Sequence, residues 1–220
     1  NNPAAAASLI VNGVLNVQSW INRGDVTINS AGVLNNSGTI NQGLSSIVNE
    51  GTITIVDGGT LNTPVGAAQT TLEMRGGSLL NNGAITGTVN VYNGALASGD
   101  GTYDDVTLNL GGMFSPGDGV GTATTDAVKW KAGGVYLFEL SDLASDLWDL
   151  NTLAITATSA NQFLFNLDFV GSSFNLGADA TWDIVHADAG GISGFDSAAF
   201  MFDTTDFAGA DSSHFSILQT

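Results

Sequence analysis

Large apolar residues recur at a fixed distance from glycine through the first half of the chain. In each of eight segments a Gly is followed by one variable residue and then by a large apolar residue. These segments are residues 13–15, 32–34, 51–53, 59–61, 77–79, 94–96, 112–114 and 134–136. Successive side chains of a β-strand point to opposite faces, so an apolar position beside a variable one indicates a strand with one buried face.

The spacing of these segments predicts how the strands are arranged. The glycines fall at positions 13, 32 and 51 and then at 59, 77, 94 and 112, so that neighbours within each series are about 17–19 residues apart. At about 3.3 Å per residue, such a stretch makes one coil of two or three short strands, and coils stack about 4.8 Å apart. We therefore expect an all-β fold, a parallel β-solenoid (β-helix) with coils of ~18–19 residues. The internal apolar ladder is expected to be Leu15, Leu34, Ile53, Leu79, Leu96 and Phe114.

Asparagine and one long step refine this picture. Asn follows the apolar residue at positions 16, 35–36, 62 and 81–82. Asn suits turns, and amides stacked at the coil spacing can hydrogen-bond along the axis. The longer step from Gly51 to Gly77 corresponds to one repeat plus an excursion, which we place around residues 63–66. Asn-Gly pairs at 12–13, 82–83 and 93–94 also fit separate hairpins, but the regular spacing favours the solenoid.

The second half of the chain has a different pattern. We expect a solenoid over residues 1–125 and a β-rich, aromatic-rich C-terminal region over 126–220, either a cap on the solenoid or a small sandwich. Alternation predicts strands over residues 135–140, 163–169 and 182–184. One helix-like stretch, Leu140 to Leu150, has Leu at spacings of three, four and three.

Charge and composition exclude several functions. The 220 residues carry a formal net charge of −17 and include no Cys. Residues 1–100 contribute −3 and residues 101–220 contribute −14. This balance argues against nucleic-acid binding, and the apolar runs are far shorter than the ~18 residues of a membrane span. Zinc–thiolate, iron–sulfur and disulfide chemistry are excluded by the missing Cys. The opening Asn1-Asn2-Pro3-Ala4 is interpreted as that of a processed, exported chain.

A family resemblance rests on motifs in both halves. Residues 111–122, GGMFSPGDGVGT, are similar to the G-x-PG-x-G-T segment of autotransporter-associated β-strand repeats. The later FEL (138–140), DL (149–150), WDIV (182–185) and ISGFD (192–196) are similar to the C-terminal part of such proteins. The chain resembles autotransporter passenger domains, filamentous-haemagglutinin-type solenoids and PEP-CTERM-type surface proteins. The resemblance implies export to the cell surface or beyond, and a β-helical fold, more than any activity.

Candidate chemical sites are few. Lyases of this shape need acid clusters and a basic residue, but the solenoid half offers only Arg23 and Arg75. We therefore expect no enzyme activity and no cofactor, with a polysaccharide lyase or hydrolase as the third function considered. Four aspartates in Gly-rich turns are weak candidates for Ca²⁺ ligands, although solvated turn acids are the expected interpretation. They are Asp100, Asp104, Asp105 and Asp118.

Both ends of the chain are candidates for self-assembly. The N-terminal Leu9, Ile10 and Val11 are apolar and lack a capping pattern, and residues 214–218, with Phe215 and Ile217, are expected to form a strand. Unpaired strand edges template the addition of further strands. We therefore expect an extracellular structural protein that forms head-to-tail homopolymers. Two alternatives remain: residues 4–11 fold back as the first coil of their own solenoid, or the protein is a monomeric adhesin for a carbohydrate or host ligand.

Overall fold

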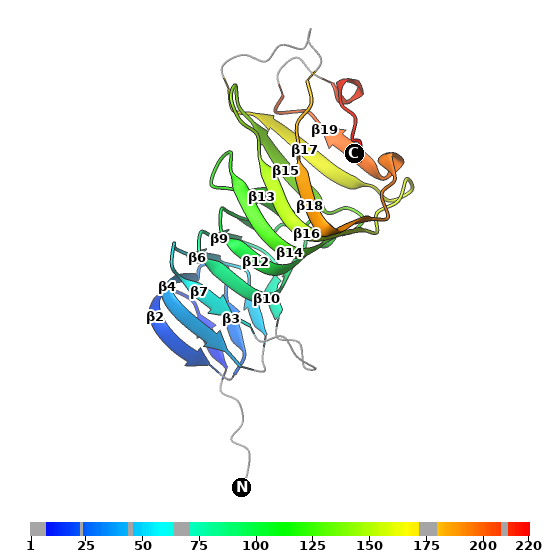
Figure 1. The fold of residues 1–220 in the computed structure, drawn as a ribbon. Helices are drawn as coiled ribbons and strands as arrows, with labels where there is room; N and C mark the ends of the chain where they lie inside the picture. The colour runs from blue at the N-terminus through cyan, green and yellow to red at the C-terminus, as the bar shows by residue number, and fades with distance from the viewer. Residues whose placement is uncertain (1–7, 23, 44–45, 64–70, 172–179, 208–210) are drawn as a thin grey trace.

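The chain folds into a stack of parallel strands. The computed structural model describes residues 8–22, 24–43, 46–63, 71–171, 180–207 and 211–220. Figure 1 shows the strands following one another along an elongated axis, from the blue N-terminal end to the orange C-terminal end. The strands are β1 (Leu9–Val11), β2 (Val14–Asn22), β3 (Val26–Ile28), β4 (Val33–Gln42), β5 (Ile47–Asn49), β6 (Thr52–Ile55), β7 (Thr60–Asn62), β8 (Thr71–Met74), β9 (Ser78–Asn81), β10 (Ala84–Val91), β11 (Leu96–Gly99), β12 (Thr102–Leu108), β13 (Met113–Pro116), β14 (Thr122–Trp130), β15 (Val135–Leu140), β16 (Leu147–Ile155), β17 (Phe163–Phe169), β18 (Val185–Ser193) and β19 (Phe200–Asp203).

Strand pairing defines three faces, and every pairing between named strands is parallel. Face one contains the first halves of β2 and β4, then β6, β9, β11, β13, β15, β17 and β19. Face two contains the second halves of β2 and β4, then β7 and the first halves of β10, β12, β14, β16 and β18. Face three contains β1, β3, β5, β8 and the second halves of β10, β12, β14, β16 and β18. The expected parallel β-solenoid is therefore confirmed.

The coils lengthen toward the C-terminal end. The aligned positions on face one are Val14, Val33, Thr52, Ser78, Leu96, Met113, Val135, Leu164 and Met201. Along the sequence, successive positions are separated by few residues in the first coils and by many more in the last two. Most of the excursion expected around residues 63–66 lies outside the described residues. The stack crosses residue 125 within β14, and the strands β15 to β19 extend the same parallel pairing.

The internal ladder on face one follows the prediction with one exception. Leu34, Ile53, Leu79 and Phe114 are buried and aligned, and Leu15 is half-buried at the N-terminal end. The aligned residue of the next coil is Ala97, not Leu96, which is only half-buried.

The error at Leu96 has a structural cause in the preceding turn. Gly32, Gly59, Gly112 and Gly134 each donate their N–H to the carbonyl three residues earlier, and in this coil Ala95 makes the same bond to Tyr92. Ala95 thus replaces the second Gly of the turn, and counting from Gly94 shifts the alternation by one residue. A one-residue shift moves every side chain to the other face.

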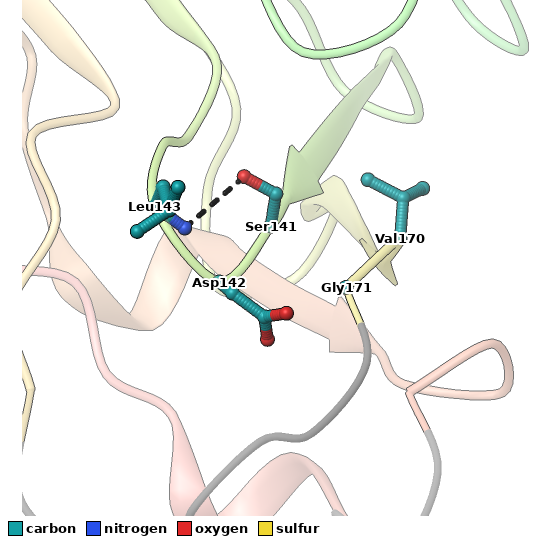
Figure 2. A pocket seen from close by; sticks show the side chains of 5 residues that line it. All are labelled: Ser141, Asp142, Leu143, Val170 and Gly171. Carbon is teal, nitrogen blue, oxygen red and sulfur yellow. Dashed lines mark hydrogen bonds between the residues drawn. The ribbon is translucent and has the colours of Figure 1, made fainter.

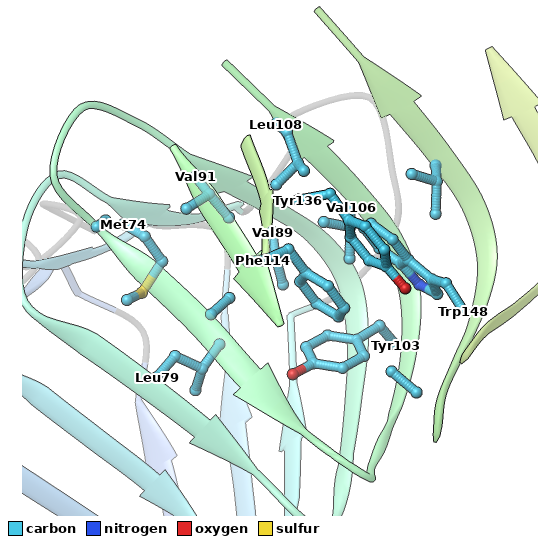
Figure 3. Close-up of a cluster of buried hydrophobic side chains, with 14 of the residues drawn as sticks. Met74, Leu79, Val89, Val91, Tyr103, Val106, Leu108, Phe114, Tyr136 and Trp148 are labelled. Atoms are coloured by element: carbon cyan, nitrogen blue, oxygen red, sulfur yellow. The ribbon is translucent and has the colours of Figure 1, made fainter. Parts of the chain in front are cut away.

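Aromatic rings replace aliphatic side chains in the core as the coils widen. Phe114 stacks on Trp148 with ring centroids 3.8 Å apart, and Trp148 stacks on Tyr136 at 5.7 Å. Tyr103 makes an edge contact with Phe114 at 5.5 Å, as Figure 3 shows for the labelled rings. Large flat side chains bury more area each and so fill a wider interior.

No helix forms over Leu140 to Leu150, where helical spacing suggested one. Leu140 ends β15, Leu143 is 98% exposed at a turn, and Leu147 begins β16. The leucines therefore belong to two strands and a turn. Within the described chain the helical elements are two short 3-10 helices, η1 (Ser197–Ala199) and η2 (Ser212–His214).

Candidate functional site

The N-terminal segment forms the first strand of its own solenoid. In β1, Leu9, Ile10 and Val11 pair in parallel with Val26, Thr27 and Ile28 of β3. Val11 is buried in the core, Leu9 is half-buried, and Ile10 is 57% exposed. Of the two arrangements considered for residues 4–11, the single chain therefore has the one that folds back onto its own solenoid over Leu9–Val11, whereas residues 4–7 lie outside the described residues.

The N-terminal end of the stack is nevertheless open. Among the described residues, β1 pairs only with β3 and β2 pairs only with β4, so each has one unpaired edge. We call the side chains that end the stack here the N-terminal end surface: Leu9, Ile10, Val14, Leu15, Trp20 and Ile21. Val14 and Ile21 are 67% and 71% exposed, and Leu15 and Trp20 are half-buried. Residues 8–22 include no charged side chain, so this edge lacks the charges that normally protect an exposed strand.

The C-terminal end is covered in a different way. The strand expected over residues 214–218 is not formed: His214 ends η2, and residues 215–220 are not in a strand. Phe215 instead packs on its own protein, with ring centroids 5.3 Å from Phe207 and 6.1 Å from Phe202, and Ile217 packs against the core.

The last strand of faces two and three carries edge-protecting features. β18 pairs with β16 with a register shift between Leu150 and Thr152, and the exposed Asp188 lies within the shifted stretch. Bulges and charges on an edge strand discourage further pairing. The two ends of the solenoid therefore differ in charge: both edge strands have a register shift, in β2 between Val17 and Ser19, but only the C-terminal edge carries a charged side chain in the shifted stretch.

A cavity of about 910 Å³ lies in the widest part of the solenoid. Side chains of β15, β17 and β19 line one side, β16, β18 and residues 180–184 line another, and residues 214–220 complete it. Five aromatic side chains contribute to its walls: Phe138, Phe165, Trp182, Phe202 and Phe215. Its polar side chains include Asp183, His186 and His214.

The wall at Ile184 is fixed by hydrogen bonds to the core. The buried hydroxyl of Tyr136 and the backbone N–H of Trp148 both donate to the Ile184 carbonyl, at 3.2 and 3.1 Å. His186 Nδ1 lies 2.8 Å from Asp149 Oδ1, and this hydrogen bond raises the pKa of His186. The imidazole at this wall is thus already paired with a carboxylate of its own chain.

A second hollow, of about 430 Å³, is a shallow surface feature. It is lined by Ser141, Asp142 and Leu143 at the turn after β15 and by Val170 and Gly171 after β17 (Figure 2). The Leu143 N–H donates to the Ser141 hydroxyl, a hydrogen bond internal to the turn. The hollow collects no set of groups that would carry chemistry.

The four aspartates considered as Ca²⁺ ligands accept hydrogen bonds or face solvent. Asp100 accepts from the Thr122 N–H, Asp104 from the Gly87 N–H and Asp105 from the Thr88 hydroxyl. Asp118 is exposed in its turn. Burial, with the neighbouring charges of Asp104 and Asp126, raises the pKa of Asp105. In the part of the chain that the structure describes, no group of three or more His, Cys, Asp or Glu side chains is placed to hold a metal ion.

A buried carboxyl that the sequence did not single out is Asp146. It accepts the backbone N–H of Gly121 and of Glu139, both at 2.9 Å, and so ties the turn after β13 to β15. Burial raises the pKa of Asp146 to about 7, against the opposing effect of these two hydrogen bonds. Its position between two strands of different coils explains why no local motif indicated it.

Comparison with known proteins does not assign the chain to a family. No protein-family model matches it, and a search of curated proteins finds no match. The resemblance to autotransporter-type solenoids therefore stays a prediction. Among the described residues, no helix has the length and apolarity required to cross a membrane.

Proposed function

We propose that the protein is a structural protein of the cell surface or extracellular matrix, whose solenoids join through the N-terminal end surface. The observation that carries the proposal is the open edge of β1 and β2, with Val14 and Ile21 exposed beside it. Exposed apolar side chains gain about 25 cal/mol per Å² when a contact removes them from water. Unpaired backbone groups gain hydrogen bonds in the same contact. Composition supports the setting, because a chain without Cys and with many Gly, Asn and Thr residues is typical of exported solenoids of the resembled kind.

We propose that this surface binds a second copy of the chain through that copy's own N-terminal end surface. Charge favours this arrangement over the head-to-tail one. Residues 1–100 carry −3 and residues 101–220 carry −14, so a contact between two N-terminal ends keeps the strongly acidic halves apart. Head-to-tail addition would also require pairing to the edge of β18, which carries the exposed Asp188. A contact of one surface with itself closes as a dimer, which supplies a two-ended rod for the surface layer.

Light scattering coupled to size-exclusion chromatography tests the proposal. The wild-type protein is expected to have about twice the chain mass of 22.4 kDa. The double variant Val14→Lys/Ile21→Lys is expected to be monomeric, since lysines on an edge block pairing. The matched control is Leu110→Lys/Leu143→Lys. These two leucines are at least as exposed as Val14 and Ile21 and lie outside the N-terminal end surface, so this variant should remain dimeric. A wild-type monomer would overturn the proposal. Wild-type filaments that the Val14→Lys/Ile21→Lys variant abolishes would point to head-to-tail assembly, which uses the same edge. Filaments that persist in this variant would show that the N-terminal end surface is not the contact.

A further inference from the structure

The cavity lies at the wide end of the solenoid, beside a core of buried aromatic rings. The short coils of the N-terminal half are closed by single layers of Leu, Ile and Val, whereas the last two coils, which start at Val135 and Leu164 on face one, are the longest. Wider closed β structures enclose ligand cavities once their side chains no longer meet. The hydrogen bonds of Tyr136 and Trp148 to Ile184 hold one wall in place. The cavity is thus largely preformed, and its volume of about 910 Å³ falls within the range of ligand sites, ~300–1,000 Å³.

The charges around the cavity restrict what can enter. Residues 132–220 include no Lys or Arg. Of the polar side chains in the wall, Asp183 is an acid and His186 is paired with Asp149. An anionic ligand would lose its hydration and meet only His186 and His214, whose imidazoles are already paired with Asp149 and Asp211. Aromatic walls, in contrast, favour flat rings through stacking and edge contacts.

We propose that this cavity is a binding site for an uncharged, ring-bearing apolar small molecule. The half-buried rings of Phe202 on β19 and of Trp182 and Phe215 on the segments that close the cavity supply contact area, and the buried rings of Phe138 and Phe165 form the wall behind them. The site is separate from the N-terminal end surface, at the opposite end of the solenoid (Figure 1). It therefore does not depend on the proposed structural role.

Two fluorescent probes that differ by one sulfonate test the site. N-phenyl-1-naphthylamine is uncharged, and 8-anilino-1-naphthalenesulfonate is a similar pair of rings with a negative charge. Titration is expected to show one saturable site for the uncharged probe, with affinity at least about tenfold higher than for the anion. The titration is repeated on Val14→Lys/Ile21→Lys, and unchanged binding there excludes the N-terminal end surface as the binding site.

Variants that fill the cavity locate the probe. Ala187→Trp adds a large side chain to the cavity wall on β18 and should weaken binding by about tenfold or more. Ala198→Trp adds the same side chain at an exposed position of η1 and should leave binding unchanged. If circular dichroism shows that Ala187→Trp does not fold, Val185→Phe in the cavity is compared with Val170→Phe, which is exposed. Equal binding of both probes, or a folded cavity variant that binds as the wild type does, would overturn the proposal.

Discussion

The side-chain amide of Asn81 donates to the Thr102 carbonyl of the next coil at 3.1 Å, while its Oδ1 accepts the N–H of Gly83. Asn36 and Asn49 make the same pair of bonds, each to a Gly N–H two residues later and to a carbonyl of the following coil. All three are fully buried. Each amide therefore closes a corner within its coil and ties that coil to the next.

Removing the Asn81 amide should be costly. We expect Asn81→Ala to reduce the free energy of unfolding by about 1–3 kcal/mol, because the Gly83 N–H and the Thr102 carbonyl both lose their bond to this buried side chain. Asn16→Ala removes an exposed Asn–Asn hydrogen bond of 2.8 Å to Asn35 and should cost less than ~0.5 kcal/mol. Urea unfolding of both variants measures the difference. Equal costs would show that the corner bonds do not matter.

The direction of side chains on face one gives a second prediction. Leu79 is buried and aligns with Ile53 of the previous coil. Thr52 precedes Ile53 and faces outward. Leu79→Asp brings an unpaired charge into the core and should cost on the order of 5 kcal/mol, enough to unfold the chain. Thr52→Asp should change the melting temperature little. Circular dichroism melts test this, and similar damage from both would contradict the assigned faces.

Two adjacent glycines make a third, sharply matched comparison. Gly77 has φ +62°, and a Cβ there would lie 1.8 Å from the Gly51 carbonyl oxygen. Gly76 has its nearest such neighbour at 3.7 Å, an ordinary contact. Gly77→Ala should therefore destabilise the protein by more than ~2 kcal/mol, whereas Gly76→Ala should be neutral or stabilising by up to ~1 kcal/mol. Thermal unfolding of the two variants measures the contrast, and the reverse order would mean that the turn is placed one residue away.

The buried carboxyl of Asp146 predicts a pH dependence. Its pKa rises from 3.8 to about 7 on folding, so the folded protein binds the proton more tightly than the unfolded chain does. The contribution of this group is therefore fully present below pH ~4 and is lost as the pH rises through ~7, by on the order of 4 kcal/mol. The stability of wild type minus that of Asp146→Asn should accordingly fall between pH 4 and pH 7. A difference that grows over this range would show that the hydrogen bonds from Gly121 and Glu139 outweigh burial.

The sequence predicted the narrow part of the fold better than the wide part. A short coil of regular length repeats its Gly, its turn and its inward residue in register, so Leu34, Ile53 and Leu79 could be identified from spacing alone. The stacked amides of Asn16 and Asn35 were expected for the same reason and are confirmed. Leu96 was placed wrongly because Ala95 occupies a position that is Gly in other coils.

The candidate sites depend on features that spacing does not encode. The coils that start at Met113, Val135 and Leu164 differ in length and share no period, so the continued stacking beyond residue 125 was not visible. The cavity arises from how far the strands of the last coils stand apart. Val14 is more exposed than its aligned partner Val33 because no described strand lies beyond β2, which single-residue patterns do not report. Ile21 occupies an outward-facing position that is also exposed at Asn41 of the next coil. The absence of charge over residues 8–22 was the available signal for that edge, and the prediction used it only for the part before residue 12.

The graded coil length has a mechanical consequence. Each coil contacts only its neighbours, so a rod anchored in a surface layer and pulled from its N-terminal end would peel one coil at a time. At roughly 3.5 Å per extended residue, a released coil of about 19 residues adds up to about 65 Å of contour length, and a last coil of about 37 residues adds about 130 Å. Under tension the molecule would thus extend in unequal steps, short at first and longest just before the aromatic end gives way.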